Sequence, residues 1–279
     1  MSVVSEIERI KTNIANTYTV LEELGAEIPE DKNSDNLQIT ATTIPTGGGS
    51  EITKGLIINE CDSDGYITDA SIVGFTEIPD YYFYRVGYCY NKATGIWVRV
   101  GANVHLPNNL TKIGTQAFYE WNYSWAITEL PDSVTEIGQF AFYNNYYLAL
   151  TKLPSSLIKL NSYAFNNCEN LKVSETPVGV TLIPNSAFYK CSSISEMTIK
   201  GVITQIDYNA FYGCSKLAKL VMPNITSVPT LKSTSAFDST PIKSGTGYIY
   251  VPDSLVTQMQ SASNWATYAS QIKGVSELW

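Results

Sequence analysis

A short motif returns at a nearly constant interval along this chain, and the repetition limits the possible folds more than any other feature. Each copy centres on an Ala-Phe pair, in the segments TKIGTQAFYEW, TEIGQFAFYNN, IKLNSYAFNNC, TLIPNSAFYKC and TQIDYNAFYGC. The five phenylalanines lie 24, 23, 23 and 23 residues apart, and they are Phe118, Phe142, Phe165, Phe188 and Phe211. A degenerate copy ends at Phe237, and a candidate first copy ends at Phe83. A unit this short has no core of its own, so the units must stack and bury shared apolar columns.

Other residue types keep the same register. One aliphatic column precedes the Ala-Phe pairs, and it comprises Ile113, Ile137, Leu160, Ile183 and Ile206. A second column follows them, and it comprises Leu148, Leu171, Ile194 and Leu217. Cys168, Cys191 and Cys214 stand three residues after the phenylalanine, where Asn145 and Trp121 stand in earlier units. We expect the Cys or Asn side chain to satisfy backbone groups at a tight turn, with the phenylalanine inside.

The segments NSYAFNNCENLKVSETP and YNAFYGCSKLAKLVMPN resemble the BspA-like leucine-rich repeats of bacterial and related surface proteins. That family's unit reads roughly I-G-x-x-A-F-x-x-C-x-x-L-x-x-L-x-L-P. The resemblance extends from about Ile67 to Pro252. It implies an α+β repeat solenoid with one short parallel strand in each unit. We assign residues 53–246 to this solenoid and expect a hairpin at its N-terminal end, between GLIIN and GYITDASIV.

Residues 1–28 carry a heptad seam along one predicted helix. Its members are Val3, Ile7, Ile10, Ile14, Thr17, Leu21 and Leu24. Since an isolated helix of this length is marginal in water, it needs a partner. Isoleucine at both seam positions favours a trimeric coiled coil, so we expect a homo-oligomer. The alternative is a helix that folds back onto the solenoid.

Residues 29–52 form a polar, glycine-rich linker. Gly25, Ile28, Pro29, Leu37 and Ile44 follow a pattern that resembles the N-terminal segments of bacteriophage tail and virion proteins. At the other end, residues 247–279 predict a strand at Tyr248–Val251 and a helical cap, with Asp253 and Ser263 or Asn264 as N-caps. We expect Trp265, Tyr268 and Ile272 to cover the final coil.

Candidates for chemistry are few. The single histidine, His105, aligns with outward-facing repeat positions and has no second histidine with which to form a catalytic pair. No cysteine lies in a C-x-x-C pair, so the sequence predicts no metal, cofactor or enzymatic activity, and it assigns no role to Cys61 or Cys89. The segment ECDSDG imitates a calcium loop, but its twelfth position is Ser71 rather than glutamate. A hairpin turn explains it better.

Aromatic residues concentrate where two neighbouring units follow their phenylalanines. The predicted binding cluster at this edge comprises Trp121, Tyr123, Trp125, Tyr143, Tyr146 and Tyr147. Exposed Tyr and Trp give large contact areas at little entropic cost. The alternative, equally weighted, is that the rings pack inside the early coils.

The net charge of -8 and the pI near 4.8 argue against nucleic acid and an anionic membrane as partners. No apolar stretch is long enough to insert into a membrane, and the N-terminus has no secretory signal. The leading hypothesis is therefore a non-enzymatic virion protein of a bacteriophage (tail, baseplate or head fibre), made in the host cytoplasm. It would be held by its N-terminal helix to other virion proteins and would attach to a host glycan or protein. The alternative is a BspA-like adhesin at the bacterial cell surface.

Overall fold

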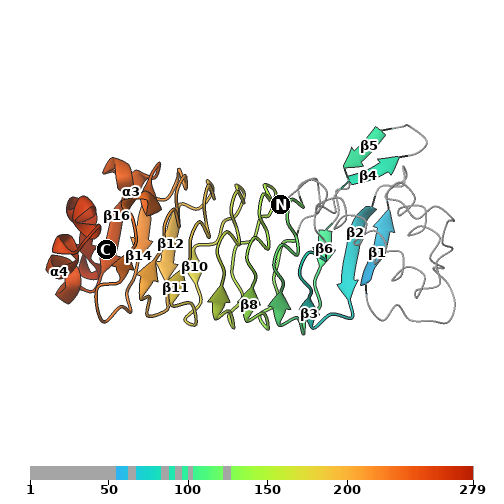
Figure 1. Cartoon of the computed structure of the whole chain (residues 1–279), viewed down its shortest axis with the longest axis horizontal. Helices are drawn as coiled ribbons and strands as arrows, with labels where there is room; N and C mark the ends of the chain where they lie inside the picture. Colours follow the sequence, from blue (N-terminus) through green and yellow to red (C-terminus); the bar gives the residue numbers. More distant parts are fainter. Residues whose placement is uncertain are drawn as a thin grey trace, which may run out of the picture. The chain divides into compact units, whose positions relative to one another are not determined.

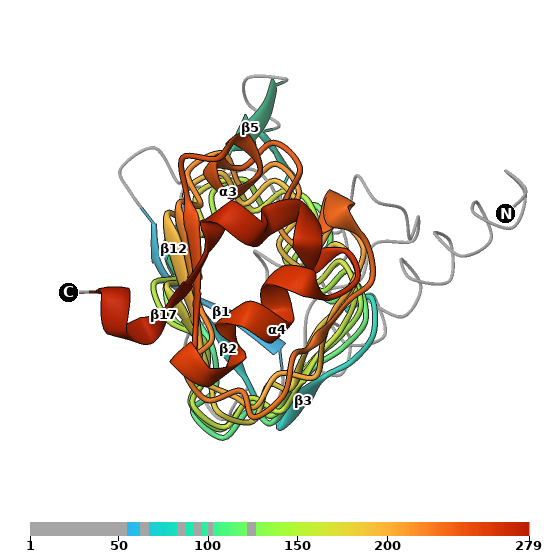
Figure 2. The ribbon, with the colours of Figure 1, turned by 90° about the vertical axis from the view of Figure 1, so that its left-hand side faces the viewer.

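The computed structural model describes residues 55–61, 67–82, 88–91, 96–99, 103–121 and 127–278. The chain divides into two compact units, and most of the described residues belong to the unit of Lys54–Gly87 and Val100–Trp279. Within this unit, successive coils stack along one axis (Figure 1), and a view along the axis shows the coils superposed (Figure 2). The predicted helix at 1–28, with its whole heptad seam, and the predicted linker at 29–52 lie outside the described residues.

Short parallel strands precede the Ala-Phe turn of each coil. They pair in two runs, β3-β7-β8-β9 and β11-β13-β15. These strands are β3 (Glu77–Ile78), β7 (Lys112–Ile113), β8 (Glu136–Ile137), β9 (Lys159–Leu160), β11 (Leu182–Ile183), β13 (Gln205–Ile206) and β15 (Thr230–Leu231). Lys112 pairs with Glu136 and Glu136 pairs with Lys159, so the strand register follows the sequence period.

A second parallel sheet follows the turns of the later coils, in the order β10-β12-β14-β16-β17. Its strands are β10 (Glu175–Thr176), β12 (Glu196–Ile199), β14 (Lys219–Val221), β16 (Tyr248–Val251) and β17 (Ile272–Gly274). The later coils therefore have two strands each, and the expectation of one strand per unit is wrong for them. The reason is that two segments of these coils are extended. The segment after the second aliphatic column forms the predicted strand, and a further pair of residues before the Ala-Phe turn pairs with its equivalent in the next coil.

The break between the two runs of the first sheet has a simple cause. In most coils the residue directly after the first strand donates its N–H to the preceding coil, as Gly138 N does to Ile113 O and Asp207 N to Ile183 O, at 2.8 and 2.9 Å. Pro184 occupies this position after β11 and has no N–H to donate. The ladder is therefore interrupted between β9 and β11.

The phenylalanines form one continuous column through the interior. Phe118, Phe142, Phe165, Phe188, Phe211 and Phe237 are all 0% exposed. Successive rings are nearly parallel, with centroids 5.2, 5.4, 5.8, 5.5 and 5.8 Å apart. The two predicted aliphatic columns are buried beside them. The stacked-repeat prediction is confirmed at its central point.

In four coils the side chain three residues after the phenylalanine bonds to the turn of the preceding coil. Cys168, Cys191 and Cys214 donate their Sγ hydrogens to the carbonyls of Phe142, Phe165 and Phe188, each at 3.0 Å. In the preceding coil Asn145 Nδ2 donates to Phe118 O at 2.6 Å. The predicted role of this column is confirmed. Burial raises the pKa of all three thiols, so they remain protonated donors.

The N-terminal end adds a hairpin to the coils. β1 (Gly55–Cys61) pairs antiparallel with β2 (Ile67–Val73), as predicted, and β2 pairs in parallel with β6 (Asn103–His105). The partners Glu77 and Lys112 are 35 positions apart, whereas Lys112 and Glu136 are 24 apart. A second antiparallel hairpin, β4 (Tyr88–Asn91) and β5 (Ile96–Arg99), accounts for the longer interval. It belongs to the other compact unit.

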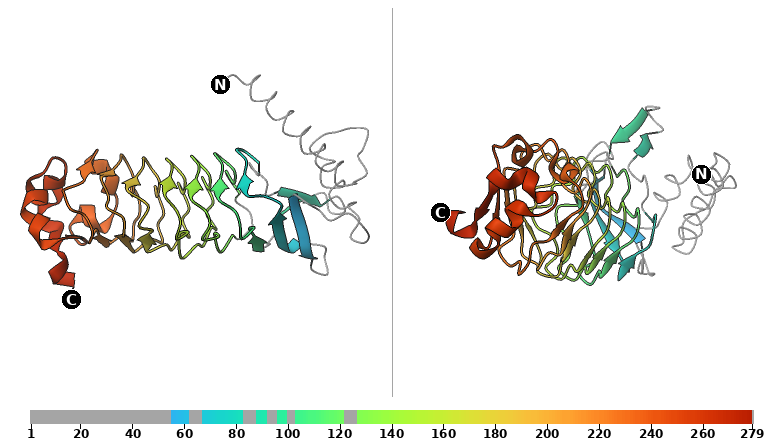
Figure 3. Two further views of the ribbon diagram at one scale, coloured as in Figure 1. Left: turned by 90° about the horizontal axis from the view of Figure 1, so that it is seen from below. Right: turned by 60° about the vertical axis from the view of Figure 1, so that its left-hand side comes forward.

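Short helices follow the last coils at the C-terminal end (Figure 3). They are η1 (Thr234–Phe237), α3 (Pro241–Ser244), η2 (Asp253–Leu255), α4 (Val256–Ser261), η3 (Trp265–Gln271) and η4 (Val275–Leu278). Trp265 and Tyr268 are each 1% exposed, and their ring centroids lie 6.1 and 5.4 Å from that of Phe237. Trp265 Nε1 donates to Pro229 O at 2.7 Å. The apolar end of the phenylalanine column is covered in this way.

Asn264 stands at the predicted N-cap position of η3, whereas Asp253 is the first residue of η2, and the N-cap of η2 is Pro252. Asn264 precedes η3, but its side chain makes no cap bond and donates to Leu231 O at 2.7 Å instead. Asp253 accepts from Ser276 N and Oγ, at 3.3 and 3.0 Å. Both side chains form hydrogen bonds with segments distant in the chain, and no local sequence pattern predicts such bonds. The strand β17, which pairs with β16, was not predicted either.

Thr176 yields a first testable prediction. It is 0% exposed, and its hydroxyl has no hydrogen-bond partner among the described residues. Its strand partner in the next coil is the buried Ile199. Because an unsatisfied buried hydroxyl costs about 1–3 kcal/mol, we expect Thr176→Val to raise the free energy of unfolding by about 1 kcal/mol. Urea denaturation of the full chain measures it.

Thr204→Val is the matched control, because the exposed Thr204 hydroxyl donates to Thr181 O at 3.1 Å. This variant should lose up to about 1 kcal/mol. A loss of stability in Thr176→Val would contradict the prediction and would mean that this hydroxyl has a partner, such as a buried water.

Candidate functional site

The structure separates the predicted aromatic cluster into buried and surface members. Trp121 is 3% exposed, with its ring centroid 4.8 Å from that of Phe118. It therefore follows the internal-packing alternative, because it occupies the buried column of Asn145 and Cys168. Tyr143 and Tyr146 are half-buried, and Tyr147 is 51% exposed. Tyr123 and Trp125 lie outside the described residues.

A larger aromatic surface lies at the Ala-Phe turns of four successive coils. We call it the turn face. In each coil it comprises four residues: the third and second before the phenylalanine, and the first and second after it. The four phenylalanines are Phe142, Phe165, Phe188 and Phe211. The rings of the turn face are Phe140, Tyr143, Tyr163, Tyr189, Tyr208 and Tyr212, so each coil contributes at least one. Tyr208 is 52% exposed, and the other five are half-buried. Of these six, only Tyr143 was predicted. The alignment contained the signal, since three of the four coils have Tyr directly after Phe.

The rings of neighbouring coils contact one another in offset stacks. Phe140 stacks on Tyr163 at 4.6 Å between centroids, and Tyr189 stacks on Tyr212 at 4.8 Å. Tyr143 stacks on Tyr119 at 4.8 Å and meets Phe140 edge-on at 5.6 Å. Parallel rings with centroids this far apart are displaced sideways. Parts of their faces therefore remain available at the surface.

Two of these rings occupy a strained backbone position. The residue two before each phenylalanine has positive φ, which is 55° for Phe140, 61° for Tyr163, 53° for Ser186 and 54° for Asn209. Asn and Gly tolerate this left-handed conformation, whereas a bulky side chain there is an outlier. Strain of this kind costs about 1 kcal/mol or more and concentrates at functional sites. Two coils thus place a ring where the last of the four coils has asparagine.

The backbone of the turn face is held in place by hydrogen bonds between coils. Phe140 N donates to Ser162 O at 3.1 Å, Phe142 N to Ala164 O at 2.8 Å and Asn144 N to Asn166 O at 2.8 Å. The same three bonds join the next coils, as in Tyr163 N to Asn185 O at 2.9 Å. A surface built in this way is preorganised for binding.

Amides run beside the rings. Asn167 Nδ2 donates to Asn144 Oδ1 at 2.8 Å, and Asn185 Nδ2 donates to the Tyr163 hydroxyl at 3.3 Å. Lys190 is the one charged residue among the turn-face positions. Its Nζ lies 5.5 Å from the centroid of the Tyr189 ring. The turn face is therefore nearly neutral and combines aromatic with amide groups.

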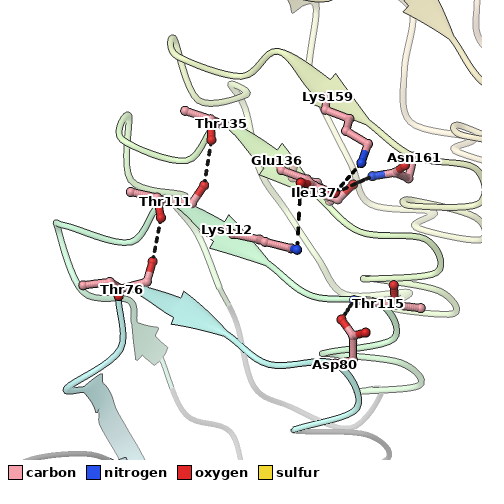
Figure 4. Close-up of polar contacts among 10 residues, drawn as sticks. All are labelled: Thr76, Asp80, Thr111, Lys112, Thr115, Thr135, Glu136, Ile137, Lys159 and Asn161. Carbon is pink, nitrogen blue, oxygen red and sulfur yellow. Dashed lines mark hydrogen bonds and ion pairs between the residues drawn. The ribbon is translucent and has the colours of Figure 1, made fainter.

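Charged residues gather instead on the strand faces, where they pair across coils. Glu136 contacts Lys112 and Lys159 at 3.9 and 2.9 Å, beside a row of threonines that bond to the preceding coil (Figure 4). The hydrogen bond from Lys159 lowers the pKa of Glu136. On the second sheet Lys219 pairs with Glu196 and Lys200 pairs with Glu175, at 2.5 and 2.7 Å. These charges are largely satisfied within the protein.

Other candidate sites carry little chemistry. His105 is exposed at the end of β6, as predicted. Within the described residues no group of three or more His, Cys, Asp or Glu side chains could hold a metal ion. No helix in the described part of the chain is long and apolar enough to cross a membrane.

Residues 101–218 match the family model described as BspA type leucine rich repeat region, in six copies. The repeated short parallel strands are consistent with this type of repeat. A solved structure, the leucine rich cell surface protein of Faecalibacterium prausnitzii A2-165, superposes with a TM-score of 0.50 at 22% identity. The match covers 73% of this chain and 54% of that protein, so the chain spans about half of that protein's length. At this identity the likeness shows a shared fold. No curated protein matches the chain.

Proposed function

We propose that the coils form a non-enzymatic binding scaffold of a bacterial surface protein, and that the turn face is its ligand-binding surface. The repeat type and the likeness to a cell surface protein support this alternative of the two hypotheses that the sequence raises. The observation that carries the binding role is the placement of Phe140 and Tyr163 in a left-handed conformation, half-buried, where other coils have Gln, Ser or Asn. A fold alone does not require rings at that position.

The virion hypothesis stays a prediction. It depends on the similarity of the first 45 or so residues to bacteriophage proteins, and these residues lie outside the described part of the chain. The same holds for the predicted trimer, whose seam of Val3, Ile7, Ile10, Ile14, Leu21 and Leu24 is not described. Neither the repeats nor the turn face favours a virion over a cell surface.

The binding role is tested by exposing the full chain to a panel of immobilised glycans and extracellular-matrix proteins. We expect the wild type to bind at least one member, and the double variant Tyr143→Ala/Tyr163→Ala to lose at least tenfold in affinity for it. Tyr248→Ala is the matched control, because Tyr248 is 37% exposed on β16, away from the turn face. Equal affinity of all three proteins, or binding by none, would overturn the proposal.

Phe140→Asn separates binding from folding. Relief of backbone strain, about 1 kcal/mol, opposes the loss of ring stacking, about 0.5–1.5 kcal/mol. We therefore expect the free energy of unfolding to change by less than about 1 kcal/mol, while affinity for the ligand falls. If this variant binds normally, Phe140 is only a packing residue.

A further inference from the structure

We infer that the ligand of the turn face is a neutral carbohydrate polymer that lies along the coil axis. This inference rests on the proposed binding role and specifies its chemistry. Three properties of the turn face carry it: the pairing of rings with amides, the near absence of charge, and the repetition from coil to coil.

The side-chain chemistry fits a sugar. A pyranose ring has an apolar face of C–H groups and a rim of hydroxyls that both donate and accept hydrogen bonds. The half-buried rings of Phe140 and Tyr143 match the first feature. The amide side chains of Asn144 and Asn167, which follow the rings in sequence, match the second. Asn144 accepts from Asn167 and donates to Glu120, and each amide still has a further N–H and a further lone pair for a ligand.

The distribution of charge indicates a neutral ligand. Among the sixteen turn-face positions Lys190 alone is charged; Glu120 Oε1 of the adjoining coil lies 3.3 Å from Asn144 Nδ2, and the chain as a whole carries -8. Sulfated or sialylated glycans would be repelled by the net charge and would find one cation on this surface. A protein partner that docks through ion pairs would need charged residues, and these lie on the strand faces rather than on the turn face. There Glu136, Lys159 and Lys219 already form ion pairs within the protein.

The repetition indicates a polymer and its direction. Rings recur in every coil from Phe140 to Tyr212, and stacked pairs are separated by 4.6 and 4.8 Å along the series. A ligand with one conformation repeated along its length meets at least one ring in each of the four coils. Each added sugar then binds at high effective concentration, so affinity should grow with chain length until the four coils are covered.

The experiment measures binding of the full chain to neutral homo-oligosaccharides of increasing length, with heparin and a matrix protein as competing probes. We expect affinity to rise with oligosaccharide length and to change less than twofold between low and high salt, because no ion pairs form. Tyr143→Ala/Tyr163→Ala should lose at least tenfold, whereas Tyr248→Ala should stay within twofold of the wild type.

Each outcome decides between the two proposals. Binding of the matrix protein that the double variant loses, with no neutral glycan bound, overturns the carbohydrate inference and leaves the binding role intact. Binding of heparin that salt abolishes does the same. If no probe binds, or if Tyr143→Ala/Tyr163→Ala binds as the wild type does, both the inference and the binding role fail.

Discussion

Phe165→Ala should lower the free energy of unfolding by about 3–5 kcal/mol, the range for emptying a fully buried aromatic site. Phe165 is 0% exposed and stacks on Phe142 and Phe188, at 5.4 and 5.8 Å. The cavity therefore removes contacts from two neighbouring coils, and the rigid ladder of backbone bonds around it prevents collapse. Urea denaturation and thermal unfolding followed by circular dichroism measure the effect, with an expected fall in Tm of about 10 °C.

Val178→Ala is the control for this measurement, because Val178 is 69% exposed and should change stability by less than about 0.5 kcal/mol. Phe165→Leu, which retains most of the apolar volume, should lie between the two. A Phe165→Ala protein as stable as the wild type would mean that the phenylalanine column is not the core of the coils.

Trp265→Ala should also lower the free energy of unfolding by about 3–5 kcal/mol, but the loss of structure should concentrate at the C-terminal end. Trp265 covers Phe237, and its Nε1 satisfies Pro229 O, so truncation exposes the last ring of the column and removes a buried hydrogen bond. Coils at the end of a stack have a neighbour on one side alone. We expect faster amide exchange in β16 and β17 before global unfolding.

Trp265→Phe isolates the hydrogen bond from the packing. It keeps an aromatic ring against Phe237 and loses the N–H donor, so the expected cost falls to about 1–2 kcal/mol. Uniform loss of protection through all coils in Trp265→Ala, rather than loss at β16 and β17, would contradict the assignment of this residue to end protection.

The interior could be predicted from the sequence because every inner column obeys the period. Phe142 and Phe165, Ile137 and Leu160, and the hydrogen-bonding Cys168 are all placed by alignment alone. Trp121 could have been assigned correctly on the same ground, since it stands in the column of Cys168. The repeat register indicates correctly that Trp121 is buried, whereas the local aromatic composition placed it at the surface.

The surface could be predicted only in part. The residue two before each phenylalanine, from Phe140 to Asn209, has a left-handed backbone, and the sequence gives no sign of this at Phe140 or Tyr163, since neither is Gly or Asn. The strands before the Ala-Phe turns were missed because each is two residues long and has no distinctive alternation, whereas β16 of the second sheet was predicted. The bonds of Asp253 and Asn264 join segments distant in the chain, which local capping rules do not address.

Alternate backbone N–H groups of the turns donate to the immediately neighbouring coil, as Phe142 N does to Ala164 O and Phe165 N to Ala187 O. After duplication or deletion of a coil, the coils on either side would therefore find the same hydrogen-bond partners, and Trp265 would still cover the last coil. Recombination between such alike gene segments can lengthen or shorten the protein without redesign. The length of the protein can therefore change in steps of one coil.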